Sequence, residues 1–102
     1  MPAYVIAYRE TPVRDEAAIA EYSRLNRENA ALFQQDFGVR PLVVYGASEA
    51  PEGQNPDGVV MLQFDTVEAA RAWYHSPQYQ KALAHRKLGA DWRVVIVEGL
   101  PS

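Results

Sequence analysis

The sequence contains no cysteine. That absence excludes disulfide bonds, thiolate metal sites and cysteine nucleophiles. Runs rich in lysine and arginine are missing as well, and the net charge is -3, so the chain lacks the basic surface that nucleic-acid binding requires. No apolar run approaches the roughly 20 residues that span a bilayer. We therefore expect neither a nucleic-acid partner nor a membrane partner.

The beginning of the chain lacks the features of a targeting segment. The stretch "MPAYVIAYRE" has no basic n-region and no cleavage site, so we expect a strand there rather than a signal peptide, and a cytoplasmic protein. The 102 residues suit one domain near the commonest size. No internal repeat and no linker interrupts them, and we predict a single domain over residues 1–102.

Strand-like segments are apolar on both sides. Tyr4, Ile6 and Tyr8 share one face of the first segment, and the residues that alternate with them are apolar too. The stretch 47–58 is rich in Pro, Gly and Asn and is predicted to be a loop. The predicted strands are residues 3–9, 39–46, 59–64 and 92–99.

The segments between the strands have helical periodicity. A single helix is predicted over residues 16–35, where apolar residues recur at helical spacing. A second helix over residues 67–75 is followed by Ser76 and Pro77, which suit the N-cap and the first position of another helix. That last helix is predicted to end near Gly89.

This order of elements predicts an α+β protein with a ferredoxin-like βαββαβ fold. Its four-stranded antiparallel sheet would carry the helices on one face. The other face of such a sheet is ordinarily polar, but these strands are apolar on both faces. Because large exposed apolar patches are rare on monomers, we predict a homodimer in which a second copy covers the open face with two-fold symmetry.

Three stretches carry a resemblance to a known family. "PAYVIAY" at the start, "VVMLQF" followed by "TVEAARAWYHSPQYQ" in the middle, and "VVIVEG" at the end resemble the family called domain of unknown function 1330. The segment "EAARAWYHSPQYQ", followed by Leu83 and Arg86, is the most specific part. The resemblance implies membership of the dimeric α/β-barrel superfamily, in which ferredoxin-like protomers pair sheet to sheet.

The resemblance implies little about chemistry. The family has no generally established activity, and its superfamily includes cofactor-independent monooxygenases, isomerases of small lactones, haem enzymes and stress proteins. A shared fold is only an association with any of these activities. The chain also departs from the family pattern, because Gln78 stands where an acidic residue is common and His75 where a small polar or acidic residue is usual. A family function that depends on these two positions is not implied.

Arg86 is the most informative candidate for a functional residue. It shares a helix face with Tyr79 and Leu83, so its charge must reach solvent or meet an acceptor. One interpretation is an ion pair with a carboxylate such as Glu98 or Asp91. The other is an anchor for a substrate carboxylate or phenolate, because a guanidinium group suits such anions. The sequence leaves both interpretations open.

Polar residues on the long predicted helix point to the same region. Asn26 and Asn29 project near the middle of its apolar face, and buried amides need partners. Together with Tyr22 they would line a pocket between this helix and the sheet. His75 and His85 are weaker candidates for ligand contacts, and boundary positions are their default. Two histidines without a carboxylate partner make a poor metal signal, so we expect no metal and no cofactor.

Two hypotheses for function follow from these residues. The first is a homodimer that binds a small organic acid or an aromatic compound between helices and sheet, and an activity of the cofactor-independent monooxygenase or isomerase type would fit such a pocket. The second is a structural or regulatory dimer with a filled core and no catalytic role. A cavity that touches Arg86 favours the first hypothesis, whereas Arg86 paired with a protein carboxylate favours the second.

Overall fold

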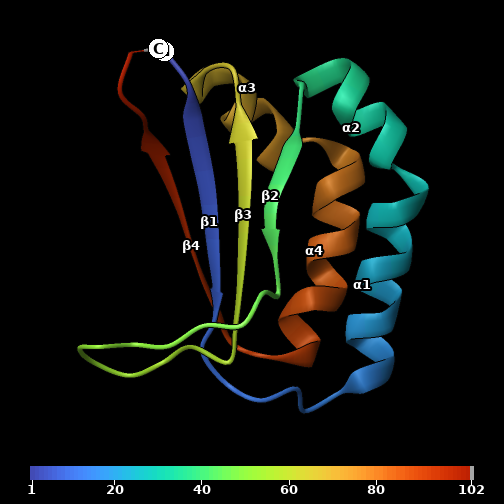
Figure 1. The fold of residues 1–102 in the computed structure, drawn as a ribbon. Helices are drawn as coiled ribbons and strands as arrows, with labels where there is room; N and C mark the ends of the chain where they lie inside the picture. The colour runs from blue at the N-terminus through green and yellow to red at the C-terminus, as the bar shows by residue number, and fades with distance from the viewer. Residues whose placement is uncertain (102) are drawn as a thin grey trace.

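The computed structural model describes residues 1–101. One layer of β-sheet packs against one layer of helices (Figure 1). The elements are β1 (Ala3–Arg9), α1 (Glu16–Glu28), α2 (Ala30–Phe37), β2 (Arg40–Val44), β3 (Gly58–Phe64), α3 (Val67–Tyr74), α4 (Pro77–Gly89) and β4 (Trp92–Glu98).

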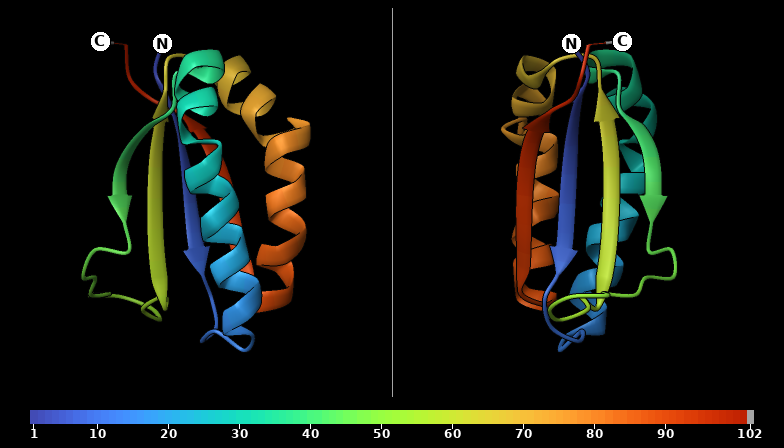
Figure 2. Two further views of the ribbon diagram at one scale, coloured as in Figure 1. Left: turned by 90° about the vertical axis from the view of Figure 1, so that its right-hand side faces the viewer. Right: turned by 60° about the vertical axis from the view of Figure 1, so that its left-hand side comes forward.

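The strands form one antiparallel sheet in the order β2-β3-β1-β4. β1 is central, and its Val5 lies between Leu62 of β3 and Ile96 of β4. The helices all lie on one side of the sheet, as both views in Figure 2 show. The sheet and its helical layer confirm the prediction of a ferredoxin-like α+β fold with helices on one face.

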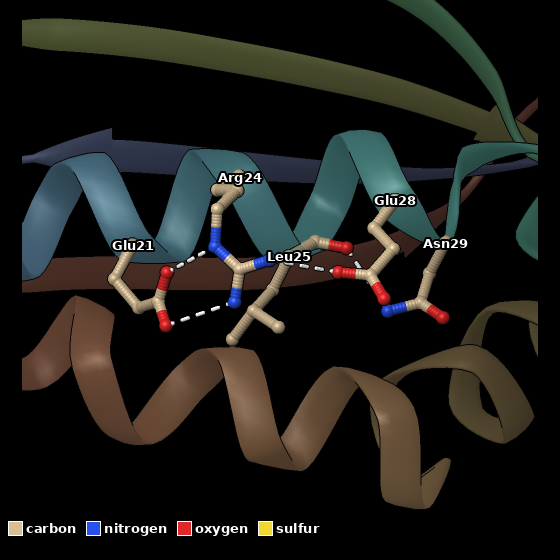
Figure 3. Close-up of polar contacts among 5 residues, drawn as sticks. All are labelled: Glu21, Arg24, Leu25, Glu28 and Asn29. Carbon is tan, nitrogen blue, oxygen red and sulfur yellow. Dashed lines mark hydrogen bonds and ion pairs between the residues drawn. The ribbon is translucent and has the colours of Figure 1, made fainter.

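The first helical region is divided in two, so the single helix predicted over residues 16–35 is wrong. The break falls at Asn29, whose side-chain Nδ2 donates to the backbone carbonyl of Leu25 at 2.9 Å (Figure 3). An asparagine amide that bonds to the backbone competes with continued helix formation. Arg24, which pairs with carboxylates one turn to either side, supports the last turns of α1 before the break.

The helical region also runs further than predicted. α2 continues to Phe37, and Gly38 follows it with φ 70°. A glycine in this left-handed conformation is a common way to end a helix. The new axis of α2 brings Phe33 into the core, where it is buried.

Aromatic rings fill the core between the sheet and the helices. Trp73 of α3 lies among them, with its ring centroid 4.1 Å from that of Tyr79, 5.4 Å from that of Phe64 and 6.3 Å from that of Phe33. Phe64 and Tyr79 are almost completely buried. The turn between α3 and α4 is therefore a packed corner, and it fixes the position of the Tyr79 hydroxyl.

The other face of the sheet carries no helix and is apolar around its middle, although Gln63 and Arg93 lie on the same face. Ile6 of β1 lies at its centre, with Met61 of β3 and Val95 of β4 beside it in the register. Val95 and Val97 are 39% and 43% exposed. The strands are thus apolar on both faces, as their alternation predicts.

Gly89→Ala is expected to lower the free energy of unfolding by about 1–3 kcal/mol, although alanine is the better helix former. Gly89 lies where α4 packs against α1. A β-carbon there would lie 2.5 Å from Ile19 Cδ1 and 3.3 Å from the carbonyl oxygen of Asp15. Urea unfolding followed by circular dichroism measures the loss. In an Ile19→Ala background the penalty should largely disappear, and an equal penalty in both backgrounds would contradict the steric explanation.

Candidate functional site

A cavity of about 660 Å³, the main cavity, lies between the α1–α2 pair and the β2–β3 edge of the sheet. This volume is within the roughly 300–1,000 Å³ that is usual for small-molecule sites. Apolar side chains such as Phe33, Val39 and Leu62 make up most of its wall. The polar residues of the wall are Tyr22, Ser23, Asn26, Arg27, Gln34, Arg40 and Tyr45.

Tyr22 connects this cavity to a buried charge. Its hydroxyl lies 2.9 Å from the hydroxyl of Tyr79, although the two residues are far apart in the sequence. The Tyr79 hydroxyl in turn accepts a hydrogen bond from Nη1 of Arg86 at 3.2 Å. Helices α1 and α4, which pack side by side, thus bring together two of the predicted site residues, Tyr22 and Arg86.

The hydrogen bond from Arg86 indicates which hydroxyl donates in the Tyr79–Tyr22 hydrogen bond. Because Tyr79 accepts from Arg86, its own proton must go to the Tyr22 oxygen or have no acceptor among its hydrogen-bonded neighbours. The Tyr22 proton then remains available to a molecule in the cavity. Burial raises the pKa of Tyr79, which therefore stays a neutral donor. We call the hydrogen-bonded series from Arg86 through Tyr79 to Tyr22 the donor relay.

Arg86 is 4% exposed and has no carboxylate partner within residues 1–101. The ion pair proposed from the sequence is wrong for both candidates. Asp91 pairs instead with Arg14 at 3.0 Å. Glu98 is exposed at the opposite end of β4, where it lies beside Ala3. Arg86 also does not line the main cavity and reaches it only through the donor relay.

Aromatic rings surround the Arg86 guanidinium where a counter-ion is missing. Its central carbon lies 5.4 Å from the ring centroid of Trp92 and 6.0 Å from that of Tyr22. Such cation–π contacts contribute about 0.5–2 kcal/mol each. They offset only part of the cost of a buried charge, which amounts to several kcal/mol. The site therefore holds positive charge that the described residues do not neutralise.

The two asparagines have different roles. Asn26 lines the main cavity, and its Oδ1 is buried without a hydrogen-bond partner. A buried acceptor of this kind costs free energy until a donor reaches it. Asn29 does not line the cavity, because its amide is held by the Leu25 carbonyl at the helix break. The structure thus brings only the first of the pair to the pocket.

The two histidines do not join the site. His75 is exposed at the C-terminal cap of α3, and its ring contacts Tyr74. His85 is half-buried on the flank of α4. Neither lines the main cavity. Within residues 1–101, no group of three or more His, Cys, Asp or Glu side chains is placed to hold a metal ion, and no helix is long and apolar enough to cross a membrane.

Tyr45 is a further residue of the cavity wall. The strand predicted over residues 39–46 ends early, at Val44, because Tyr45 has φ 58°. This left-handed conformation is uncommon for a large side chain. The ring lies against Gly58, where a β-carbon would come within 2.9 Å of it. The nearby glycine is the one sequence signal that indicates such a close approach.

The environment of Tyr45 continues the polar wall of the cavity. Its ring centroid is 6.3 Å from that of Trp92 and 5.5 Å from the guanidinium carbon of Arg9. Burial raises the pKa of Tyr45, so the phenol remains protonated and can donate. Hydroxyl donors from α1 and from the end of β2 therefore line the same cavity.

The fold places the chain among the ferredoxin-like proteins. A dimeric ferredoxin-like protein of unknown function from Jannaschia sp. CCS1 is 15% identical, with a TM-score of 0.71 over 97% of this chain and 100% of that one. A protein of unknown function from Rhodopseudomonas palustris is 17% identical, with a TM-score of 0.67 over 99% of this chain and 84% of that one. At these identities the similarity is evidence for the fold alone.

The family is shown by sequence. The chain belongs to the family described as domain of unknown function (DUF1330), whose profile matches residues 2–100. A Nitrosomonas europaea protein, provisionally assigned as an antibiotic biosynthesis monooxygenase, is 18% identical, with a TM-score of 0.64 over 97% of this chain and 90% of that one. No curated protein matches the chain significantly in sequence.

Proposed function

We propose that the protein is a homodimer that binds a small organic acid with an apolar or aromatic body in the main cavity. The observation that carries this proposal is the donor relay, which ends at Tyr22, a residue that lines a cavity of about 660 Å³. The apolar wall suits the body of such a ligand, and Tyr22 would donate to its carboxylate oxygen. The buried charge of Arg86 strengthens this donor through Tyr79.

The mouth of the cavity adds to the preference for an anion. Arg27 lines it, is exposed, and makes no ion pair within residues 1–101. Arg40 lines it too and is paired with Asp65 at 3.0 Å. A carboxylate in the cavity would therefore meet positive charge and hydroxyl donors, whereas a cationic ligand would find no opposite charge in the wall.

The proposed function is binding rather than proton abstraction. Aside from arginines and tyrosines, the described residues of the wall include no ionisable side chain, so they supply no histidine or carboxylate as a general base. The Nitrosomonas europaea protein is a structural neighbour at 18% identity, and that similarity does not carry its assignment to this chain. The alternative of a filled core is disfavoured by the volume of the main cavity.

The homodimer is proposed on the open face of the sheet. Ile6, Met61 and Val95 form an apolar surface there, opposite the helices. Structural neighbours from Jannaschia sp. CCS1 and Bacteroides fragilis are described as dimeric. Pairing of two such faces would remove apolar surface from water without affecting the cavities on the helical side.

Benzoate and phenylacetate are expected to bind to the purified protein more tightly than their neutral methyl esters. Tyr22→Phe should weaken carboxylate binding roughly tenfold, because it removes one hydrogen bond to a charged acceptor and keeps the ring. Isothermal titration calorimetry measures the affinities. Tyr74→Phe is the matched control, since Tyr74 lies in the same aromatic cluster but does not line the cavity.

The location of binding can be read from a tryptophan signal. The chain has 2 tryptophans, and Trp73 lines the main cavity. Its indole N–H resonance should therefore shift when benzoate binds. Equal affinity for acids and esters, or an unchanged Trp73 resonance in the presence of bound benzoate, would overturn the proposed site.

A further inference from the structure

A second, smaller cavity is lined by Arg86 itself. Its volume is about 340 Å³, and it is formed where the end of α4 meets the start of β4. Arg86, Lys87, Asp91 and Trp92 line it together with one alanine. None of these residues lines the main cavity, so the two spaces are distinct.

The buried polar atoms of this smaller cavity include two donors that lack acceptors. Arg86 Nε and Trp92 Nε1 are both buried, and neither makes a hydrogen bond within residues 1–101. They come from different elements, a helix and a strand, so local backbone geometry does not explain them together. Buried polar groups without partners are rare in native proteins. Both residues line the smaller cavity, and a guanidinium beside an indole N–H matches a ligand that offers oxygen acceptors.

The charges around the smaller cavity are mostly positive. Arg86 and Lys87 contribute two cations. Asp91 is the one carboxylate in the lining, and it is already paired with Arg14 at 3.0 Å. Arg9, which lies beside Trp92 in the sheet register, adds another guanidinium without an ion pair within residues 1–101.

The orientation of Arg86 separates its two roles. Nη1 is committed to Tyr79 and so to the donor relay. Nε belongs to the opposite edge of the guanidinium and has no partner. A single arginine can therefore support the wall of the main cavity and at the same time present a free edge elsewhere. That free edge has the fork geometry that recognises oxyanions.

We propose that the smaller cavity is a binding site for a small oxyanion, of carboxylate or phosphate type, held by Arg86 and Trp92. The anion accepts from the Arg86 guanidinium and from the Trp92 indole, and it neutralises the buried charge. The side chain of Lys87 contributes a further positive charge at the edge. This site is separate from the ligand site of the proposed function and does not depend on it.

Nuclear magnetic resonance titration of the 102-residue protein tests the site directly. Sodium phosphate and sodium acetate are added separately in Tris buffer, and sodium chloride at matched ionic strength serves as the control. The Trp92 indole and Arg86 Nε–H resonances should shift in a saturable way with at least one of the two anions. The Trp73 indole, which belongs to the main cavity, should stay in place. Comparison of the two titrations distinguishes a phosphate site from a carboxylate site.

Arg86→Met and Trp92→Phe complete the test. Arg86→Met should weaken binding of the anion by at least about tenfold, because a charged donor is lost. Its melting temperature in anion-free buffer should equal or exceed that of the parent, since an unpaired buried charge is removed. Trp92→Phe keeps an aromatic side chain, although a smaller one, and removes the indole N–H donor, so it should weaken binding roughly fivefold. Arg71→Met, at an exposed position on α3, is the matched control and should bind normally.

Each alternative result is decisive. Absence of any shift at Trp92 with both anions would overturn the proposal, as would a shift of the same size with chloride. Undiminished binding in the Arg86→Met variant would also overturn it. If that variant fails to fold, the Trp92→Phe titration still decides. The result for Trp73 with benzoate is independent, so failure of one proposal leaves the other intact.

Discussion

Trp73→Ala is expected to lower the free energy of unfolding by about 3–5 kcal/mol. Its indole packs against the rings of Phe33, Phe64 and Tyr79, and it also forms part of the wall of the main cavity. Deletion would remove a large buried apolar surface and leave a void beside an existing one. The loss is a large fraction of the roughly 5–15 kcal/mol that stabilises an ordinary domain.

Urea unfolding followed by circular dichroism measures this loss, at one fixed protein concentration because dimerisation would contribute to the stability. Leu88→Ala is the control, since Leu88 is 62% exposed on α4. It should change the free energy of unfolding by less than about 0.5 kcal/mol. A loss below about 1.5 kcal/mol for Trp73→Ala would contradict its place at the centre of the core.

The arrangement of the sheet could be predicted because its signals are local and repeated. The two-residue alternation of β1 places Ile6 on one face and Val5 on the other, and both are apolar. Pro77 after Ser76 marks the start of α4, and Ser76 caps it by accepting from the N–H of Tyr79 at 3.2 Å. These features depend on chain geometry and polarity, which a sequence displays directly.

The break at Asn29 could not be read from the same signals. Hydrophobic periodicity continues on both sides of it, so the pattern predicts one helix. At the interruption the asparagine amide donates to the carbonyl of Leu25, which also accepts from the Asn29 backbone N–H. An asparagine in an apolar pattern is equally consistent with a pocket-lining side chain. Asn26 lines the cavity, whereas Asn29 makes the hydrogen bond at the helix break.

The hydrogen bonds and ion pairs around the site join parts of the chain that are distant in the sequence. Tyr22 and Tyr79 are 57 positions apart, and their hydroxyl contact follows from the packing of α1 on α4. The sequence offered Asp91 and Glu98 as partners for Arg86, and only the three-dimensional arrangement shows Asp91 engaged with Arg14. The lack of a carboxylate partner for Arg86 within residues 1–101 is a property of the packed chain. It is also the observation on which the oxyanion site depends.

Arg86 links the two cavities, because it lines the smaller one and is hydrogen-bonded through Tyr79 to Tyr22 of the main one. Tyr79 lies two turns before Arg86 on α4, so their side chains stack along one helix face and their hydrogen bond spans the gap. Tyr22, at the end of the donor relay, lines the main cavity, and Arg86 lines the smaller one. All of this chemistry lies on the helical side of the sheet, which leaves the opposite face free for assembly.

Ile6→Lys is expected to convert the proposed homodimer into a monomer. Ile6 lies on the central strand, and both of its register partners, Met61 and Val95, are apolar. In a two-fold interface the substitution would place two new ammonium groups in one buried patch. Because burial of each unpaired charge costs several kcal/mol, the dimer dissociation constant should rise by at least about a hundredfold.

Sedimentation velocity over a range of protein concentrations measures this change. Ile6→Val retains an apolar side chain and should remain dimeric. Ala84→Lys introduces the same charge at an exposed position on α4, on the opposite side of the molecule, and should also remain dimeric. Circular dichroism must show that Ile6→Lys stays folded, since the helical side of the sheet is unchanged. A folded Ile6→Lys protein that is still dimeric would exclude the open face as the interface, and equal dissociation by Ala84→Lys would place the interface on the helices instead.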